Sequence, residues 1–99
     1  MMNAVDWVRG SDLALTCTWK DSTGAPVNMS GMTLAPFEVT PAALAANITA
    51  SVTNGPLGIF SVGIPWNANV PAGTGYLVSF RIKPNNGLPL EELIPVVLK

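Results

Sequence analysis

Apolar and polar side chains alternate from residue 13 to residue 19, and this pattern constrains the fold more than any other feature of the chain. The apolar positions are Leu13, Leu15, Cys17 and Trp19. A period of two residues is typical of a strand with one buried face. The next segment, Asp21–Val27 (DSTGAPV), contains an acidic residue, a glycine and a proline, which favour a tight turn. Because the alternation resumes at Val27–Met29, residues 9–31 predict a β-hairpin or a corner of an antiparallel sheet.

The rest of the chain also consists of short apolar segments separated by turn residues. The further predicted strands are Ala4–Arg9, Thr33–Thr40, Ile48–Thr53, Ile59–Ile64, Tyr76–Lys83 and Leu88–Leu98. Pro36 cannot donate a main-chain hydrogen bond, so its segment is expected to be an edge strand or to contain a bulge. Thr40 as an N-cap and Pro41 at the first helical position favour one or two helical turns that continue through residues 42–46, with a bare loop as the alternative.

The spacing of these segments predicts one all-β domain over residues 1–99. The expected fold is an antiparallel, immunoglobulin-like β-sandwich of about seven strands, with a helical turn near residues 41–46. A small barrel is the alternative, since periodicity does not separate the two. The expected core is Leu13, Leu15, Cys17, Trp19, Val27, Ile48, Val52, Phe60, Val62, Ile64, Tyr76, Val78 and Phe80.

The pairing of the last two strands is open. If Asn86-Gly87 forms a two-residue turn, Phe80 faces Leu93. If the loop has three residues, Arg81 faces Glu91. Both registers place one carboxylate on the core side, unless a bulge at Glu91-Glu92 turns both outward. Every choice leaves one apolar set on the outer face: Leu90, Ile94, Val96 and Leu98, or Leu93 and Val97.

Charged residues make up 11% of the chain, and the net charge is -1. A soluble domain usually carries about 25% charged residues. A surface with so few charges tends to associate, which predicts a subunit whose sides are covered by neighbours. A monomer that is simply rich in alanine, threonine and asparagine is the alternative.

The residue inventory indicates no enzyme, cofactor or metal site. The chain has no histidine, and its single cysteine, Cys17, belongs to the predicted core, which leaves no disulfide and no usual zinc site. Glu91 and Glu92 are adjacent, so on a regular strand they point to opposite faces and cannot act as a catalytic pair. Asp12 and Asp21 are expected to form turns rather than bind calcium. The scattered basic residues predict no nucleic-acid binding, and no segment resembles a secretory signal or a membrane span.

Partner contacts are expected in four segments: residues 1–7, 41–47, the connection around Trp66, and 90–99. The candidate interface residues are Trp7, Leu44, Trp66, Ile94, Val96 and Leu98. The last segment could also add to the edge of a neighbour's sheet. Trp66 has a second interpretation, because Asn67 and Asn69 beside it could complete a sugar-binding platform.

Several of the turns resemble those of a family of small phage proteins. The segments that carry the resemblance are Asp21–Val27, Gly31, Gly58–Val62 and Pro71–Tyr76, whereas the opening Arg9–Asp12 contains an insertion. They are similar to the N-terminal domain of phage baseplate upper proteins, and related sandwiches occur in tail-fibre proteins. The resemblance implies a virion structural protein without catalysis.

The sequence hypothesis is therefore a structural protein of a bacteriophage virion, assembled in the host cytoplasm. It would join or anchor tail, baseplate or fibre components through protein–protein contacts. Its expected partners are other phage structural proteins and further copies of itself, with no nucleic acid and no membrane. A capsid decoration protein and a carbohydrate-binding or receptor-binding module are the alternatives.

Overall fold

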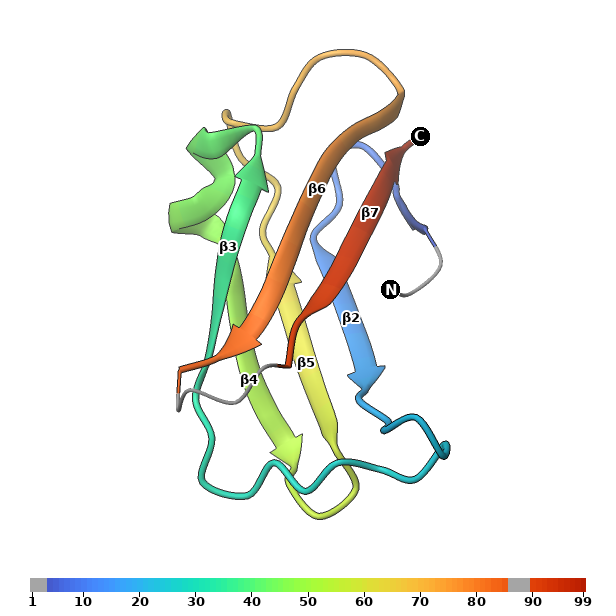
Figure 1. Cartoon of the computed structure of the whole chain (residues 1–99). Coiled ribbons are helices and arrows are strands. Elements are labelled where there is room, and N and C mark those ends of the chain that lie inside the picture. The colour runs from blue at the N-terminus through green and yellow to red at the C-terminus, as the bar shows by residue number, and fades with distance from the viewer. Residues whose placement is uncertain (1–3, 86–89) are drawn as a thin grey trace.

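Two β-sheets pack face to face in the computed structural model, which describes residues 4–85 and 90–99 (Figure 1). The first sheet has the order β1-β7-β6-β3 and the second the order β2-β5-β4. The first contains β1 (Val5–Trp7), β7 (Glu92–Leu98), β6 (Gly75–Pro84) and β3 (Leu34–Thr40). The second contains β2 (Leu13–Thr18), β5 (Ile59–Ile64) and β4 (Thr49–Asn54). The predicted all-β sandwich is confirmed.

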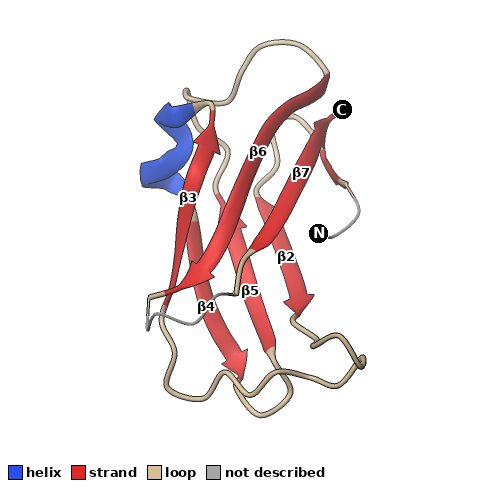
Figure 2. Ribbon diagram, viewed as in Figure 1, coloured by secondary structure: helices blue, strands red, loops and turns tan. Residues whose placement is uncertain are grey.

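The predicted helical turn is a short 3-10 helix, η1 (Ala42–Asn47), which connects the two sheets between β3 and β4 (Figure 2). It begins after Pro41 rather than after a threonine cap, and no side chain caps it. Leu44 is its buried residue. Among the described residues, no helix has the length and apolar character needed to cross a bilayer.

The alternating segment that begins at Leu13 forms β2 as expected. Leu13 and Cys17 are buried and lie opposite Ile64 and Phe60 in the antiparallel β2–β5 pair. Trp19 follows β2 on the same side, 4% exposed, with its ring 4.8 Å from that of Phe60. The outward residues of β2, β5 and β4 are mostly threonine and serine, because these strands expose only one face to solvent.

Val27–Met29 is not a strand, which corrects the first predicted hairpin. The turn at Asp21 forms, since its Oδ1 accepts hydrogen bonds from the Thr23 and Ala25 N–H groups. Beyond it the chain crosses the end of the sandwich instead of pairing along β2 (Figure 1). Val27 N–H donates to Trp19 O and Met29 N–H to Gly55 O. Each residue thus bonds to a different segment, and no ladder develops.

The position of β3 agrees with the prediction made from Pro36. β3 is an edge strand, and its pairing with β6 is interrupted by a register shift between Phe37 and Thr40. Glu38 lies in this shift with φ of 49°. The outer edge of β3 is therefore irregular.

Both predicted registers of the last hairpin are wrong. The structure pairs Phe80 with Ile94 and Ile82 with Glu92, because the connection between the strands is longer than either turn assumed. The predicted Asn86-Gly87 turn lies outside the described residues. Glu92 does lie opposite buried Ile82, so one carboxylate is on the inner side.

One pairing in the first sheet is parallel rather than antiparallel. β1 lies alongside β7, with Val5 opposite Val96 and Trp7 opposite Leu98. The chain crosses from this sheet to the other between Trp7 and Leu13, so β1 and β2 belong to different layers.

Candidate functional site

Five of the six candidate interface residues lie in the hydrophobic core. Their side chains are at most 1% exposed: Trp7, Leu44, Ile94, Val96 and Leu98. The expectation that they contact a partner is corrected, because a partner cannot reach these side chains while the chain is folded. For β7 the cause is the register with β6, which turns the even-numbered residues inward against Val78 and Phe80. The other set, Leu93 and Val97, is the one on the outer face.

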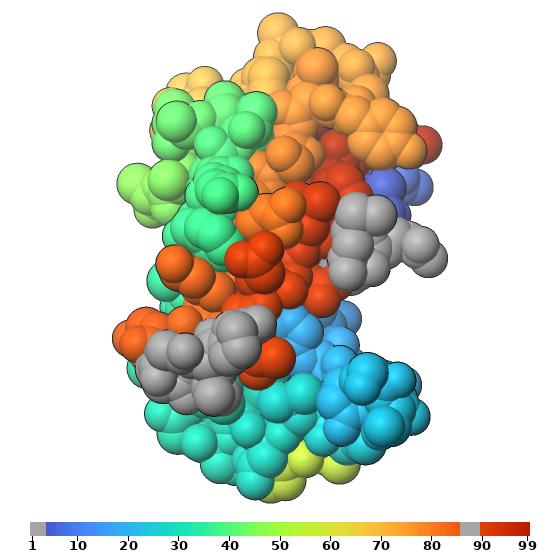
Figure 3. Space-filling model, in the orientation of Figure 1, coloured from blue at the N-terminus to red at the C-terminus, as the bar shows by residue number. Residues whose placement is uncertain are grey.

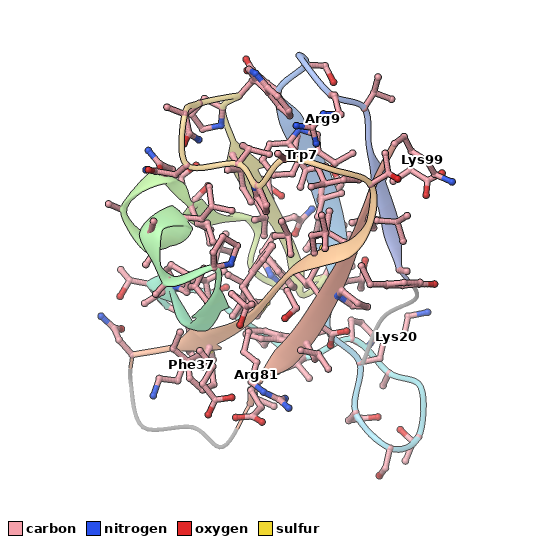
Figure 4. The ribbon with its side chains drawn as sticks, turned by 90° about the horizontal axis from the view of Figure 1, so that it is seen from above. Trp7, Arg9, Lys20, Phe37, Arg81 and Lys99 are labelled. Carbon is pink, nitrogen blue, oxygen red and sulfur yellow. The ribbon has the colours of Figure 1, made fainter. Side chains whose placement is uncertain are left out.

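Trp66 is the sixth candidate, and it is partly exposed at one end of the sandwich. The Trp7 ring meets it edge-on, with ring centroids 5.8 Å apart and an interplanar angle of 82°. The Arg9 guanidinium lies over the Trp66 ring, 5.2 Å from its centroid. Figure 4 shows Arg9 beside Trp7 at this end. Both rings therefore already have packing partners within the chain.

Arg9 is held in place by main-chain carbonyls. Its Nη1 donates to Pro71 O at 3.0 Å and to Gly73 O. Trp66 N–H donates to Asp12 Oδ1 at 2.9 Å. These bonds hold the β5–β6 connection against the segment between β1 and β2. Arg9 and Asp12 therefore have a structural role.

The asparagines beside Trp66 are also engaged within the chain. Asn67 Nδ2 donates to Pro65 O, and Asn67 Oδ1 accepts from Asn69 N–H. Asn69 Nδ2 donates to Ala43 O and to Asn47 Oδ1. A sugar site needs polar groups that are directed at the ligand. The Asn69 side chain instead ties η1 to the β5–β6 connection, and the Asn67 side chain bonds within that connection.

A further apolar surface lies on the outer side of β6 and β7, and we call it the β6–β7 face. It consists of Tyr76, Leu77, Leu93, Pro95 and Val97. Tyr76 is 75% exposed and Leu77 36%. Figure 3 shows this side of the molecule, with β3 in green and β6 and β7 in orange and red.

The exposure of Tyr76 corrects its predicted place in the core. Gly75 pairs with Leu98 and Val78 with Val96, so two residues of β6 lie opposite the single residue Val97. Such a bulge changes which residues face inward along the strand. The alternation read from Val78 back to Tyr76 is broken there, and Tyr76 points to solvent. The signal missed in the sequence is Gly75, a glycine at the start of the strand with φ of 104°.

A small charged cluster borders the β6–β7 face. Arg81 Nε lies 3.0 Å from Glu38 Oε2, and its Nη1 lies 3.0 Å from Glu91 Oε1. Lys83 Nζ is 4.5 Å from the centroid of the Phe37 ring. Figure 4 shows Arg81 and Phe37 on the same side of the molecule. The charged residues lie on β3, on β6 and directly before β7, whereas the outward residues of β7 itself, Leu93, Pro95 and Val97, are apolar.

The described residues contain no group of three or more His, Cys, Asp or Glu residues suited to a metal ion, and no pocket is found among them. Burial raises the pKa of the Cys17 thiol to about 11, and the negative charge of Glu92 adds to the effect. The nucleophilic form of cysteine is the thiolate. The thiol is therefore poorly suited to chemistry at neutral pH.

Cys17 is expected to resist alkylation by iodoacetamide at pH 8 in the folded protein and to react once the chain is unfolded in urea. The folded pKa of about 11 lies above the ordinary value of 9.0 for a cysteine thiol, so folding favours the protonated thiol. The stability linked to this group is complete below pH 9 and is lost as the pH rises toward 11. Mass spectrometry of the labelled protein measures the reaction, and fast labelling of the native chain would contradict the assignment.

Comparisons with protein-family models, with curated proteins and with solved structures find no match. The resemblance to phage baseplate domains stays a prediction. The structure shows that the segments carrying it form turns and strand starts: Asp21 closes its turn with side-chain hydrogen bonds, and Gly58 and Gly73 have positive φ.

Proposed function

We propose that this chain is a non-enzymatic structural protein of a bacteriophage virion, which joins tail, baseplate or fibre components through protein–protein contacts. The observation that carries the assembly role is the β6–β7 face. Tyr76 and Leu77 are exposed there beside the outward residues of β7. The phage assignment rests on the resemblance of the turns described above.

The charge distribution supports contact with neighbouring protein. The chain has 5 basic and 6 acidic residues. Arg81 is paired with both Glu38 and Glu91, and Lys99 Nζ lies 3.7 Å from Asp6 Oδ1. Little net charge remains to keep copies or partners apart. Exposed apolar groups bordered by polar residues are typical of interaction sites.

The outward side of the β2-β5-β4 sheet also favours an assembly role. The outward side of β2, β5 and β4 carries hydroxyl side chains and no charged residue: Thr16, Thr18, Thr49, Ser51, Thr53 and Ser61. Ser51 and Ser61 lie opposite each other with Oγ atoms 3.3 Å apart. A surface without charges can be covered by another protein at a small desolvation cost compared with a charged one.

Leu77→Glu is expected to reduce incorporation of the chain into particles about tenfold or more, because it places a carboxylate within the apolar face. Copies of the chain in purified phage particles would be counted by quantitative mass spectrometry. Leu57→Glu is the matched control, since Leu57 is 49% exposed in the turn between β4 and β5. Both variants should unfold at the temperature of the unaltered chain. Normal incorporation of Leu77→Glu would contradict the role of the face.

Detection of the chain in purified heads and in purified tails distinguishes the proposal from capsid decoration. The proposal predicts the chain in the tails, and capsid decoration predicts it in the heads. The carbohydrate-binding alternative predicts saturable glycan binding that is lost in Trp66→Ala. The engaged side chains of Asn67 and Asn69 favour assembly over this alternative.

A further inference from the structure

All but one of the sheet edges in residues 4–85 and 90–99 carry a feature that hinders the addition of another strand. β3 contains Pro36 and a register shift, and β4 has a register shift between Val52 and Asn54. β1 has three residues and carries Asp6. β7 extends beyond β1, and that part contains Pro95. Short strands, prolines, charges and bulges are the usual protections of an edge.

The two prolines lie where they protect the open side. Asn85 N–H donates to Thr33 O. Because main-chain groups point alternately to the two sides of a strand, the nitrogen of Pro36 faces away from β6. Lys99 N–H donates to Trp7 O of β1. By the same alternation the nitrogen of Pro95 also faces the β1 side, and Pro95 comes before Val96, the first residue of β7 that is paired with β1. Each proline removes a donor from a free edge.

The edge of β2 has none of these protections. Its six residues contain no proline and no charge, and its register with β5 is continuous. Trp19 N–H donates to Gly58 O at 2.9 Å, which continues that register. Alternation then assigns the main-chain groups of Ala14, Thr16 and Thr18 to the free side. All three residues are exposed, and no segment of the described chain pairs with this side.

The segment Asp12–Lys20, DLALTCTWK, is complementary to itself in the antiparallel direction. When two copies are placed about a twofold axis at Thr16, Ala14 faces Thr18 of the second copy and Thr16 faces itself. These are the residues whose main-chain groups are free, so each facing pair can exchange two hydrogen bonds. In the same register, Asp12 of each copy faces Lys20 of the other. The charges at the two ends are opposite and the centre is uncharged.

We propose that two copies of this chain associate by antiparallel pairing of their β2 strands, which joins their three-stranded sheets into one continuous sheet. The interface is isologous, as expected for a twofold dimer. It places threonine against threonine on the outer face, a favourable cross-strand pair. It also covers Leu15, which is half-buried in the single chain. The inference names one partner for the assembly role proposed above but is argued from the β2 edge alone.

Sedimentation of the purified chain between about 10 μM and about 1 mM is expected to show a monomer–dimer equilibrium. Thr16→Lys places two ammonium groups opposite each other at the axis and should weaken association about tenfold or more. Ser51→Lys is the matched control, because it adds the same charge to the same outer face on β4, away from the β2 edge. Association that is equally weak in both variants would overturn the proposed axis.

Amide hydrogen exchange of the unaltered chain tests the pairing without relying on a variant. The amides of Ala14, Thr16 and Thr18 should gain protection as concentration rises. Those of Leu15 and Cys17, which pair with β5, should be protected at every concentration. A chain that stays monomeric at about 1 mM, or a dimer that leaves the three free amides unprotected, overturns the inference. Neither result bears on Leu77→Glu in particles, so failure of the proposed function is seen separately.

Discussion

Replacing Trp7 by alanine is expected to lower the free energy of unfolding by about 3–5 kcal/mol. Trp7 is 1% exposed, and its Nε1 donates to Ser11 O at 2.7 Å. The substitution removes a large buried ring, its edge contact with Trp66 and this hydrogen bond. A domain of this size is stable by about 5–15 kcal/mol, so the loss is a large share of the total.

Thermal unfolding followed by circular dichroism measures the effect of Trp7→Ala, with an expected fall in Tm of more than about 12 °C. Tyr76→Ala is the control, because its ring is 75% exposed and a surface substitution usually changes stability by less than about 0.5 kcal/mol. If the two variants unfolded at the same temperature, Trp7 would not be anchoring β1 in the core.

Gly58→Ala is expected to cost about 3 kcal/mol or more, through two separate effects. Gly58 has φ of 66°, which alone penalises a side chain by about 1 kcal/mol. A Cβ atom at this position would lie 2.7 Å from the carbonyl oxygens of Trp19 and Val27. These atoms belong to the main chain, and Trp19 O already accepts a hydrogen bond from Val27 N–H. The clash can be relieved only by a shift of main-chain atoms, because neither contact is with a flexible side chain.

Gly24→Ala separates the two effects. Gly24 has φ of 86°, and no atom lies within 4 Å of the position of its Cβ. It should therefore show the conformational penalty alone, about 1 kcal/mol. Urea unfolding of both variants gives the comparison. Equal losses would mean that the close approach at Gly58 does not restrict the chain.

The core strands could be predicted because their two faces differ in polarity. In β2, apolar Leu13 and Cys17 alternate with alanine and threonine, so only one register buries the apolar set. The same contrast identified β5. Pro36 predicted an edge because a missing N–H is tolerated only where no ladder needs it.

The candidate interface could not be predicted from the sequence of β7. Its residues ELIPVVL are apolar on both faces, so the alternation has no phase. Only pairing with β6 decides that Ile94 and Val96 face the core and that Leu93 and Val97 face outward. The bulge at Tyr76 likewise decides which residues of β6 face outward, because a single extra residue exchanges the two faces of a strand.

The amino-acid sequence by itself determined the all-β class, the main core strands and the low surface charge, since these depend on composition and on local alternation. The tertiary structure decided which apolar residues remain exposed, which prolines protect an edge, and that, among the strands of the described residues, β2 alone has an open, unprotected side. Those properties depend on strand register and order, which arise from pairings between segments far apart in the chain.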